Sequence, residues 1–170
     1  GWSDEELKNL SKTKADTLKV EEILFTGTLY EDLGEKMRIY KLATTNFPED
    51  WRGHNNVGYV YYMQNDLSNA KANFQKANDL NENPVTLNNL GIIARIKGDR
   101  DKATELLTSA VGAGLIEIIR VSTTAEPQLT PFTVNGCAVR VNVIGPTSVG
   151  SDTYWADDSS VGLFRVPLPP

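Results

Sequence analysis

The chain has 170 residues, of which 40% are hydrophobic and 23% charged, and a net charge of −5. These values fit one compact domain, or a domain with a small appendage, rather than a disordered or fibrous chain. The acidic balance argues against a nucleic-acid partner, because neutralising phosphates needs clustered Lys and Arg, and no apolar run approaches the roughly 20 residues of a transmembrane helix.

The first two thirds of the chain show helical periodicity interrupted by turn residues. Ser3 and Glu6 form the pattern of a capping box at the start of the first helix. Helices are predicted over residues 3–15, 17–30, 32–46, 51–63, 67–80, 84–97 and 100–111. Each of these segments is too short to be stable alone in water, so we expect them to pack on one another.

A set of small and large residues recurs after 33 positions. Gly58, Ala70, Phe74 and Ala77 return as Gly91, Ala103, Leu107 and Ala110. The small residues allow the two helices of a pair to approach closely, and large residues such as Tyr61 and Phe74 fill the space between them. The pattern therefore predicts stacked two-helix repeats, in which each unit buries its apolar face against a neighbour.

These residues resemble the tetratricopeptide repeat (TPR) family over residues 17–111. The matching positions are Val57-Gly58, Tyr61, Ala70, Phe74 and Ala77 in the middle unit, Leu90-Gly91, Ala103, Leu107 and Ala110 in the last, and Leu33, Tyr40, Ala43 and Pro48 in the first. The departures are His54 and Leu87 in place of an early Trp, and Glu82 in place of Pro. The resemblance implies a mainly α fold, a TPR-like α-α superhelix of about three helix pairs.

Residues 47–56 followed by a repeat also resemble modules of bacterial cell-envelope proteins. That resemblance implies a periplasmic or envelope-associated mature chain without a signal peptide, and the cytoplasm stays open as an alternative. The TPR resemblance further implies a concave groove lined by the first helix of each unit. The groove positions are Arg52, Asn55, Asn56, Tyr59 and Tyr62 in the middle unit, and Val85, Asn88, Asn89, Ile92 and Arg95 in the last.

The predicted groove residues suit the binding of an extended peptide. Asn side chains offer both a donor and an acceptor to a peptide backbone. Tyr offers flat apolar area with a polar tip, and Arg is suited to receiving a carboxylate. The alternative is a purely structural role, in which the Asn side chains only brace neighbouring helices, because Asn is frequent at position 6 of the first helix of the repeat.

Residues 112–170 have a different composition from residues 1–111. All ten lysines lie between Lys8 and Lys102, and six of the eight prolines lie at Pro127 or later. Residues 115–121 read as a strand or a short helix, and Asn135-Gly136 predicts a tight hairpin turn between residues 132–134 and 137–139. Alternation continues to Val143, and a further strand is predicted at residues 162–166. This β-like segment is either an appendage of the repeats or foreign to them, through fusion or a shifted reading frame.

The sequence offers little catalytic chemistry. One Cys (Cys137) and one His (His54) exclude an internal disulfide, and a zinc site would need carboxylate ligands. The adjacent carboxylates Glu21-Glu22, Glu49-Asp50 and Asp157-Asp158 are typical of solvated faces and turns. We therefore expect no enzyme activity, no cofactor and no metal.

Two functions follow from these observations. The first is a non-catalytic scaffold that binds a protein or peptide partner in the concave groove. The second is a structural or assembly role, in which the β-like segment or the end of the solenoid mediates homo-oligomer formation.

Overall fold

Residues 1–112 form short helices, several of which have side-chain caps at their N-termini. The computed structural model of the chain describes residues 1–112, 118–119, 132–134, 137–139 and 163–164. The helices are α1 Asp4–Thr13, a 3-10 turn at Ala15–Thr17, α2 Val20–Thr28, α3 Leu33–Asn46, α4 Trp51–Met63, α5 Leu67–Leu80, α6 Pro84–Ile96 and α7 Arg100–Gly112. The predicted helices are confirmed, and those at residues 51–63 and 67–80 match to the residue.

One predicted helix start is wrong. The sequence predicts a helix from residue 17, whereas residues 15–17 form a 3-10 turn and α2 begins at Val20. Leu18 has an extended backbone and is only 2% exposed, because its side chain joins the core. The Lys19 amide donates a 2.8 Å hydrogen bond to Glu22 Oε2, and this bond fixes the start of α2.

The turns inside the second and third helix pairs have the same conformation. Asn65 and Gly98, which occupy equivalent repeat positions, have positive φ values of 60° and 84°. The residue after each donates to a carbonyl five positions earlier, Asp66 to Tyr61 at 2.9 Å and Asp99 to Ala94 at 2.9 Å. A left-handed residue at this place ends one helix and lets the next fold back against it.

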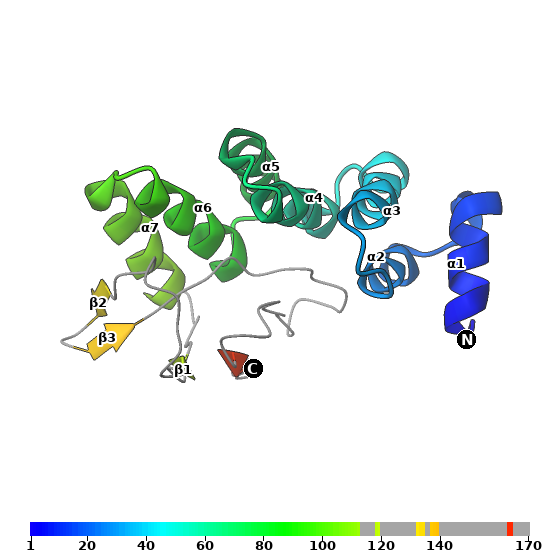
Figure 1. Ribbon diagram of the computed structural model, residues 1–170. Coiled ribbons are helices and arrows are strands. Elements are labelled where there is room, and N and C mark those ends of the chain that lie inside the picture. The colour runs from blue at the N-terminus through cyan, green and yellow to red at the C-terminus, as the bar shows by residue number, and fades with distance from the viewer. Residues whose placement is uncertain (113–117, 120–131, 135–136, 140–162, 165–170) are drawn as a thin grey trace.

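The helices form a curved array of three pairs, with α2 and α4 along one side and α3 and α5 along the other (Figure 1). In each pair a glycine of the first helix faces a large buried side chain of the second. These partners are Gly27 with Tyr40, Gly58 with Phe74 and Gly91 with Leu107. Because the glycines lack Cβ, the paired helices approach closely and leave Tyr40, Phe74 and Leu107 at most 1% exposed. The TPR-like α-α superhelix is therefore confirmed in its helix pairing.

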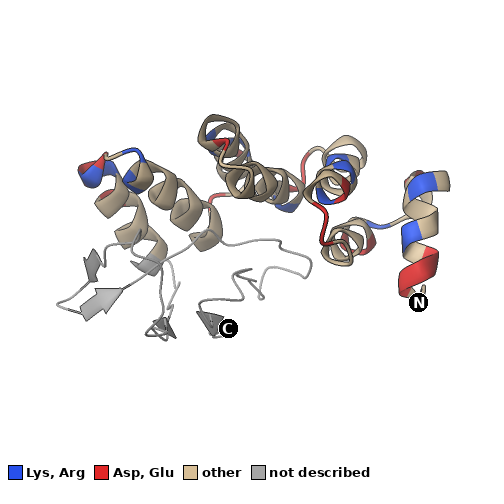
Figure 2. Cartoon of the chain, in the orientation of Figure 1, with Lys and Arg blue, Asp and Glu red and all other residues tan. Residues whose placement is uncertain are grey.

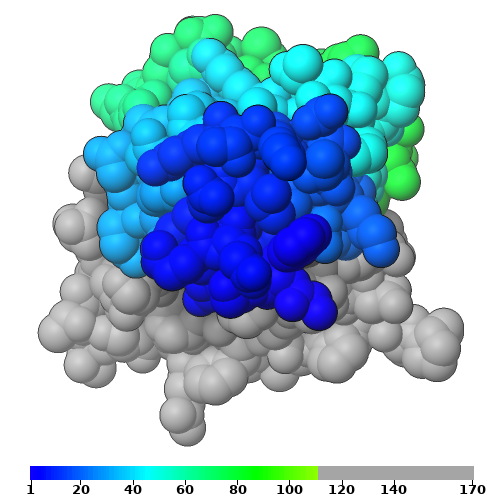
Figure 3. Space-filling model, turned by 90° about the vertical axis from the view of Figure 1, so that its right-hand side faces the viewer, coloured from blue at the N-terminus to red at the C-terminus, as the bar shows by residue number. Residues whose placement is uncertain are grey.

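The N-terminal segment covers the first pair. Arg38 Nη1 on α3 donates to the Ser11 carbonyl at 3.1 Å, and Asn46 Nδ2 donates to the Ala15 carbonyl at 3.2 Å. Leu7 of α1 is buried in the core. Figure 3 shows α1 lying over this end of the array. The segment thus acts as a terminal cap, which a helical array needs to keep its last apolar face from water.

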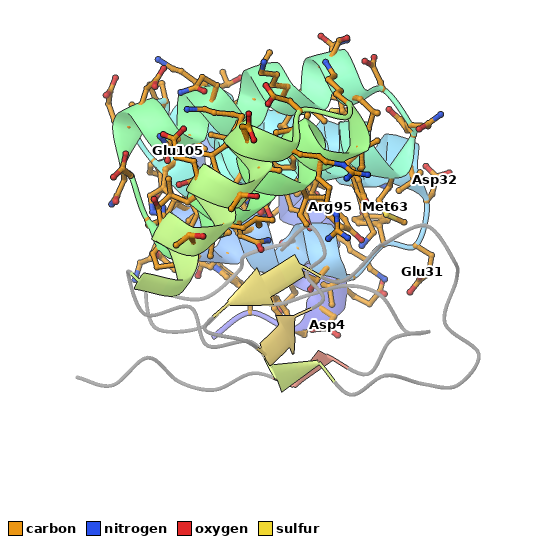
Figure 4. The ribbon with its side chains drawn as sticks, turned by 90° about the vertical axis from the view of Figure 1, so that its left-hand side faces the viewer. Asp4, Glu31, Asp32, Met63, Arg95 and Glu105 are labelled. Atoms are coloured by element: carbon orange, nitrogen blue, oxygen red, sulfur yellow. The ribbon has the colours of Figure 1, made fainter. Side chains whose placement is uncertain are left out.

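The described strands follow the sequence prediction. β2 Phe132–Val134 pairs antiparallel with β3 Cys137–Val139, with Val134 opposite Cys137, so two residues connect them as the Asn-Gly pair predicted. β1 Ile118–Ile119 pairs antiparallel with β4 Leu163–Phe164. Both lie within stretches where strands were predicted, whereas the continuation to Val143 lies outside the described residues. In Figures 1 and 4 the strands lie on the side of the array opposite α3 and α5.

Candidate peptide-binding face of the helix array

The predicted groove residues come together on α4 and α6, and we call this set the inner face: Arg52, Asn55, Asn56, Tyr59, Tyr62, Asn88, Asn89, Ile92 and Arg95. Most of them are more deeply buried than a surface groove requires. The four Asn side chains and Ile92 are 0% exposed, and Tyr59 is 2% exposed. Tyr62 and Arg95, at the C-terminal ends of the two helices, are half-buried.

Asn55 and Asn89 join the second helix pair to the third. Asn89 Nδ2 donates to Asn55 Oδ1 at 2.8 Å across 34 residues of sequence. Asn88 Nδ2 donates to Asn89 Oδ1 at 3.2 Å, which extends the chain of amides along α6. A fully satisfied buried amide network specifies one arrangement of its helices. The bracing role considered in the sequence analysis is therefore present for Asn55 and Asn89.

Arg52 already has two carboxylate partners within the chain. Its Nη2 lies 2.7 Å from Asp50 Oδ2 and 2.9 Å from Glu21 Oε1, and its side chain is 11% exposed. Hydrogen bonding to Asp50, and then to Glu21, raises the pKa of the Arg52 guanidinium above its usual value. The hydrogen bond from Arg52 lowers the pKa of Glu21. This cluster ties the start of α2 to the start of α4 and so positions the first two helix pairs.

Sequence reasoning did not find this ion cluster. Asp50 was interpreted as a turn residue, and its side chain does cap α4 by accepting from the Arg52 amide at 3.0 Å. Glu21 lies 31 residues from Arg52, and no periodic pattern indicates that pairing. The available signal was the position of Arg52 itself, in the first turn of α4 and two residues after the capping Asp50.

The ends of α4 and α6 carry a mixed apolar and cationic surface, which we call the edge strip: Tyr62, Met63, Arg95 and Ile96. Met63 and Ile96 are 48% and 43% exposed and occupy equivalent positions in successive pairs. Burial lowers the pKa of the Arg95 guanidinium. Figure 4 shows the labelled Met63 and Arg95 at the same edge of the array. An exposed large apolar side chain beside a cation suits a peptide that carries both an apolar and an acidic side chain.

Charge is unevenly divided between the helices of the array. Arg52 and Arg95 are the single Lys, Arg, Asp or Glu residues of α4 and α6 respectively, whereas α3, α5 and α7 each carry three or more. Figure 2 shows this contrast as tan stretches along α4 and α6. The inner face is therefore built from amide, aromatic and aliphatic groups, with a cation near each end.

The remaining candidate for catalytic or metal-binding chemistry among the described side chains is His54, and it has a structural contact. His54 is half-buried, and its Nε2 lies 2.9 Å from the Pro48 carbonyl oxygen. Within residues 1–112 and the short strands, no group of three or more His, Cys, Asp or Glu side chains lies in a metal-binding arrangement. The same described part of the chain contains no helix long and apolar enough to cross a membrane. The side chain of Cys137 lies outside the described features.

Comparison with protein-family models and with curated proteins finds no match. Among solved structures, the chain is similar to a thermophilic TPR protein of Thermus thermophilus, with a TM-score of 0.55 and 18% sequence identity over 65% of this chain. The match spans 63% of that protein. At this identity the similarity concerns the fold, and it shows that the helix pairs adopt a TPR-like helical repeat architecture.

Proposed function

We propose that the chain is a non-catalytic, TPR-type interaction scaffold whose inner face and edge strip bind a peptide segment of a partner protein. The observation that carries this proposal is the edge strip. Met63 and Ile96 expose apolar area at equivalent positions of successive helix pairs, and Tyr62 and Arg95 lie directly beside them in the sequence. Such alternation of apolar and polar groups along a repeat suits a ligand in extended conformation.

Each side chain of the proposed site has a distinct role. Tyr62 and Met63 supply apolar contact area to the peptide, and the phenol group of Tyr62 also makes hydrogen bonds. Arg95 attracts an acidic side chain or a C-terminal carboxylate, for which its planar guanidinium is well shaped. Asn55 and Asn89 hold α4 and α6 at a fixed spacing through their 2.8 Å hydrogen bond. Arg52 acts from the far end of α4 by keeping the first two pairs in register.

A selected peptide tests this proposal. Peptides that bind the intact chain are isolated from a random library displayed on phage, and their affinities are measured by fluorescence polarisation. We expect Tyr62→Ala and Arg95→Ala each to weaken binding at least tenfold, which corresponds to about 1.4 kcal/mol. Lys71→Ala and Lys76→Ala, at exposed positions of α5, are the matched controls and should change nothing. Peptides that respond to the α5 changes alone would contradict the proposal.

Self-association is the second candidate function, and it rests on the N-terminal end of the chain. Trp2 and Phe25 are 50% and 40% exposed, which is unusual for such large apolar side chains. A second copy could cover them by stacking on this end of the array. Light scattering of the intact chain over a hundredfold concentration range tests the idea. A mass that rises with concentration, and that Trp2→Ser returns to the monomer, is expected; a constant monomer mass would exclude self-association.

The organisation and location of the protein complete the proposal. We take residues 1–111 as the repeat unit and residues 112–170 as a separate β-like appendage, because composition and secondary structure both change between them. A periplasmic or envelope-associated location is supported by the resemblance of residues 47–56 to envelope-protein repeats. Fractionation of the natural host, with antibodies against this chain, tests the location directly.

A further inference from the structure

The turns inside the three helix pairs differ in charge. Each turn is compared over the same positions, from four residues before the Asp that caps the second helix of the pair to three residues after it: 28–35, 62–69 and 95–102. The first turn carries three acidic and no basic side chains, the second carries one acidic side chain, and the third carries four basic and two acidic side chains. The net charge therefore rises from −3 through −1 to +2 along the array.

The Asp side chain that all three turns share has a structural role. Asp32, Asp66 and Asp99 each accept a hydrogen bond from a backbone amide in the first turn of the following helix, at 2.9, 3.1 and 3.1 Å. An Asp at this position stabilises the helix that it caps. The difference between the turns therefore comes from their other charged residues, which are Glu31 and Glu35 in the first turn and Arg95, Lys97, Arg100, Asp101 and Lys102 in the third.

Three of these charges are exposed and are not neutralised within the array. Glu31 in the first turn, and Lys97 and Arg100 in the third, are exposed side chains. None of the ion pairs among the described residues involves any of the three. Glu35, in contrast, is paired with Arg38 at 3.0 Å. The two end turns thus present opposite charges that a ligand can pair with charges of its own.

Apolar area lies between the two charged turns. Met63, at the second turn, is 48% exposed, and Ile96, at the third, is 43% exposed. Figure 4 shows the labelled Glu31, Met63 and Arg95 at the same edge of the array. In Figure 2 the connection between α2 and α3 is red, and blue segments lie at the turn between α6 and α7. This edge therefore runs from an acidic end, through an apolar middle, to a basic end.

The spacing of the helix pairs sets the length of a matching ligand. Arg52 bonds to Glu21 across the first and second pairs, and Asn89 bonds to Asn55 across the second and third, so the first helices of successive pairs are direct neighbours. Packed helices lie about 8–10 Å apart, and an extended chain advances about 3.3 Å per residue. One pair therefore corresponds to about three residues of an extended ligand, and the distance between the end turns to about six.

We propose that the edge strip and the two end turns bind a peptide segment that carries a basic side chain, an apolar side chain about three residues away and an acidic side chain about six residues away. This inference rests on the proposed function, because it takes the edge strip as the binding surface and adds the charge order of the ligand. The basic side chain of the peptide pairs with Glu31, and its acidic side chain pairs with Lys97 and Arg100. The charge order fixes the direction of binding, since the reverse orientation places like charges together.

Charge reversal at one end of the edge tests the proposal. Peptides selected from the phage library on the intact chain are sequenced, and their affinities are measured by fluorescence polarisation for the intact chain and for its Lys97→Glu/Arg100→Glu variant. We expect the peptides to carry a basic and an acidic side chain about six positions apart, and the variant to bind them about fivefold more weakly. Replacing the acidic residue of the peptide by Lys should restore most of the affinity. In about 1 M NaCl, where charges are screened within about 3 Å, most of the difference should disappear.

The double variant Lys71→Glu/Lys76→Glu is the matched control, because it changes the net charge by the same amount at exposed positions of α5. It should change the affinity less than about twofold. Equal weakening by both double variants would overturn the proposal, and so would selected peptides that lack the charge order. A second copy of the chain as the occupant would also overturn it. That outcome would appear in light scattering as a mass that rises with concentration for the intact chain and stays monomeric for Lys97→Glu/Arg100→Glu.

The same measurements separate this inference from the proposed function. Peptides that respond to Tyr62→Ala and Arg95→Ala, but not to Lys97→Glu/Arg100→Glu, refute the charge order alone. Peptides that respond to none of these changes refute the edge strip as the binding surface, and the proposed function with it.

Discussion

The hydrogen bond between Asn89 and Asn55 provides the sharpest test of how the inner face is built. Both side chains are 0% exposed and 2.8 Å apart. Asn55→Ala leaves the Asn89 amide without that acceptor inside the protein, at a cost of about 1–3 kcal/mol. The better helix propensity of Ala returns roughly 0.5 kcal/mol. We therefore expect Asn55→Ala and Asn89→Ala each to lower the free energy of unfolding by about 1–2.5 kcal/mol.

A double-mutant cycle separates the bond from its surroundings. Removing both partners leaves neither half of the pair unsatisfied, so the double variant should lose less than the two single losses together, with a coupling of about 1 kcal/mol or more. Urea unfolding followed by far-UV circular dichroism gives all four free energies. Asn73→Ala, where the amide donates to the Asn69 carbonyl at 2.9 Å at an exposed site, is the matched control and should be neutral. Additive losses would refute the bracing role.

Two further predictions concern packing and charge. Gly58→Ala places a methyl 2.7 Å from Phe74 Cδ1, and overpacking that costs about 1–3 kcal/mol outweighs a helix-propensity gain of about 1 kcal/mol. The urea midpoint of unfolding should therefore fall for Gly58→Ala. It should not fall for Gly34→Ala, because Gly34 is exposed. The pKa of Glu21 is lowered in the folded state by Arg52, from an ordinary value of 4.5, so its stabilising effect is present above that value and is lost as the pH falls through the folded-state pKa. Glu21→Gln should therefore reduce stability at pH 7 but bring little further loss at about pH 3, and an equal loss at both pH values would contradict this.

Most of the helix array was predictable because its determinants are local or strictly periodic. The N-caps at Ser3 and Asp50 and the left-handed turns at Asn65 and Gly98 act within a few residues of the chain. The first pair was harder to recognise. Gly27 contacts Tyr40 as Gly58 contacts Phe74. However, α2 is shorter than α4 and α6, and Gly27 and Tyr40 are 13 residues apart whereas Gly58 and Phe74 are 16 apart, which breaks the 33-residue spacing that revealed the other two pairs.

The candidate site was only partly predictable, because repeat position indicates which way a side chain points and not what meets it there. Arg52 was predicted to bind a carboxylate of a ligand, whereas in the structure it binds the carboxylates of Asp50 and Glu21. Asn55 and Asn89 were predicted to meet a peptide backbone, and they also bind each other. The contacts of Arg52 with Glu21 and of Asn89 with Asn55 span 31 and 34 residues, and side-chain pairing at that distance is not encoded in periodicity.

The burial of α6 is indicated in the sequence by its low number of charged residues, a feature that comparison of repeat positions does not take into account. A helix with one solvated side carries charges on that side, and a helix without them is buried all round. The α6 sequence has a single charged residue, Arg95, in its last turn, whereas α7 carries four. The low charge of α6 is therefore a property of its burial, and charge introduced at its buried positions should destabilise the array.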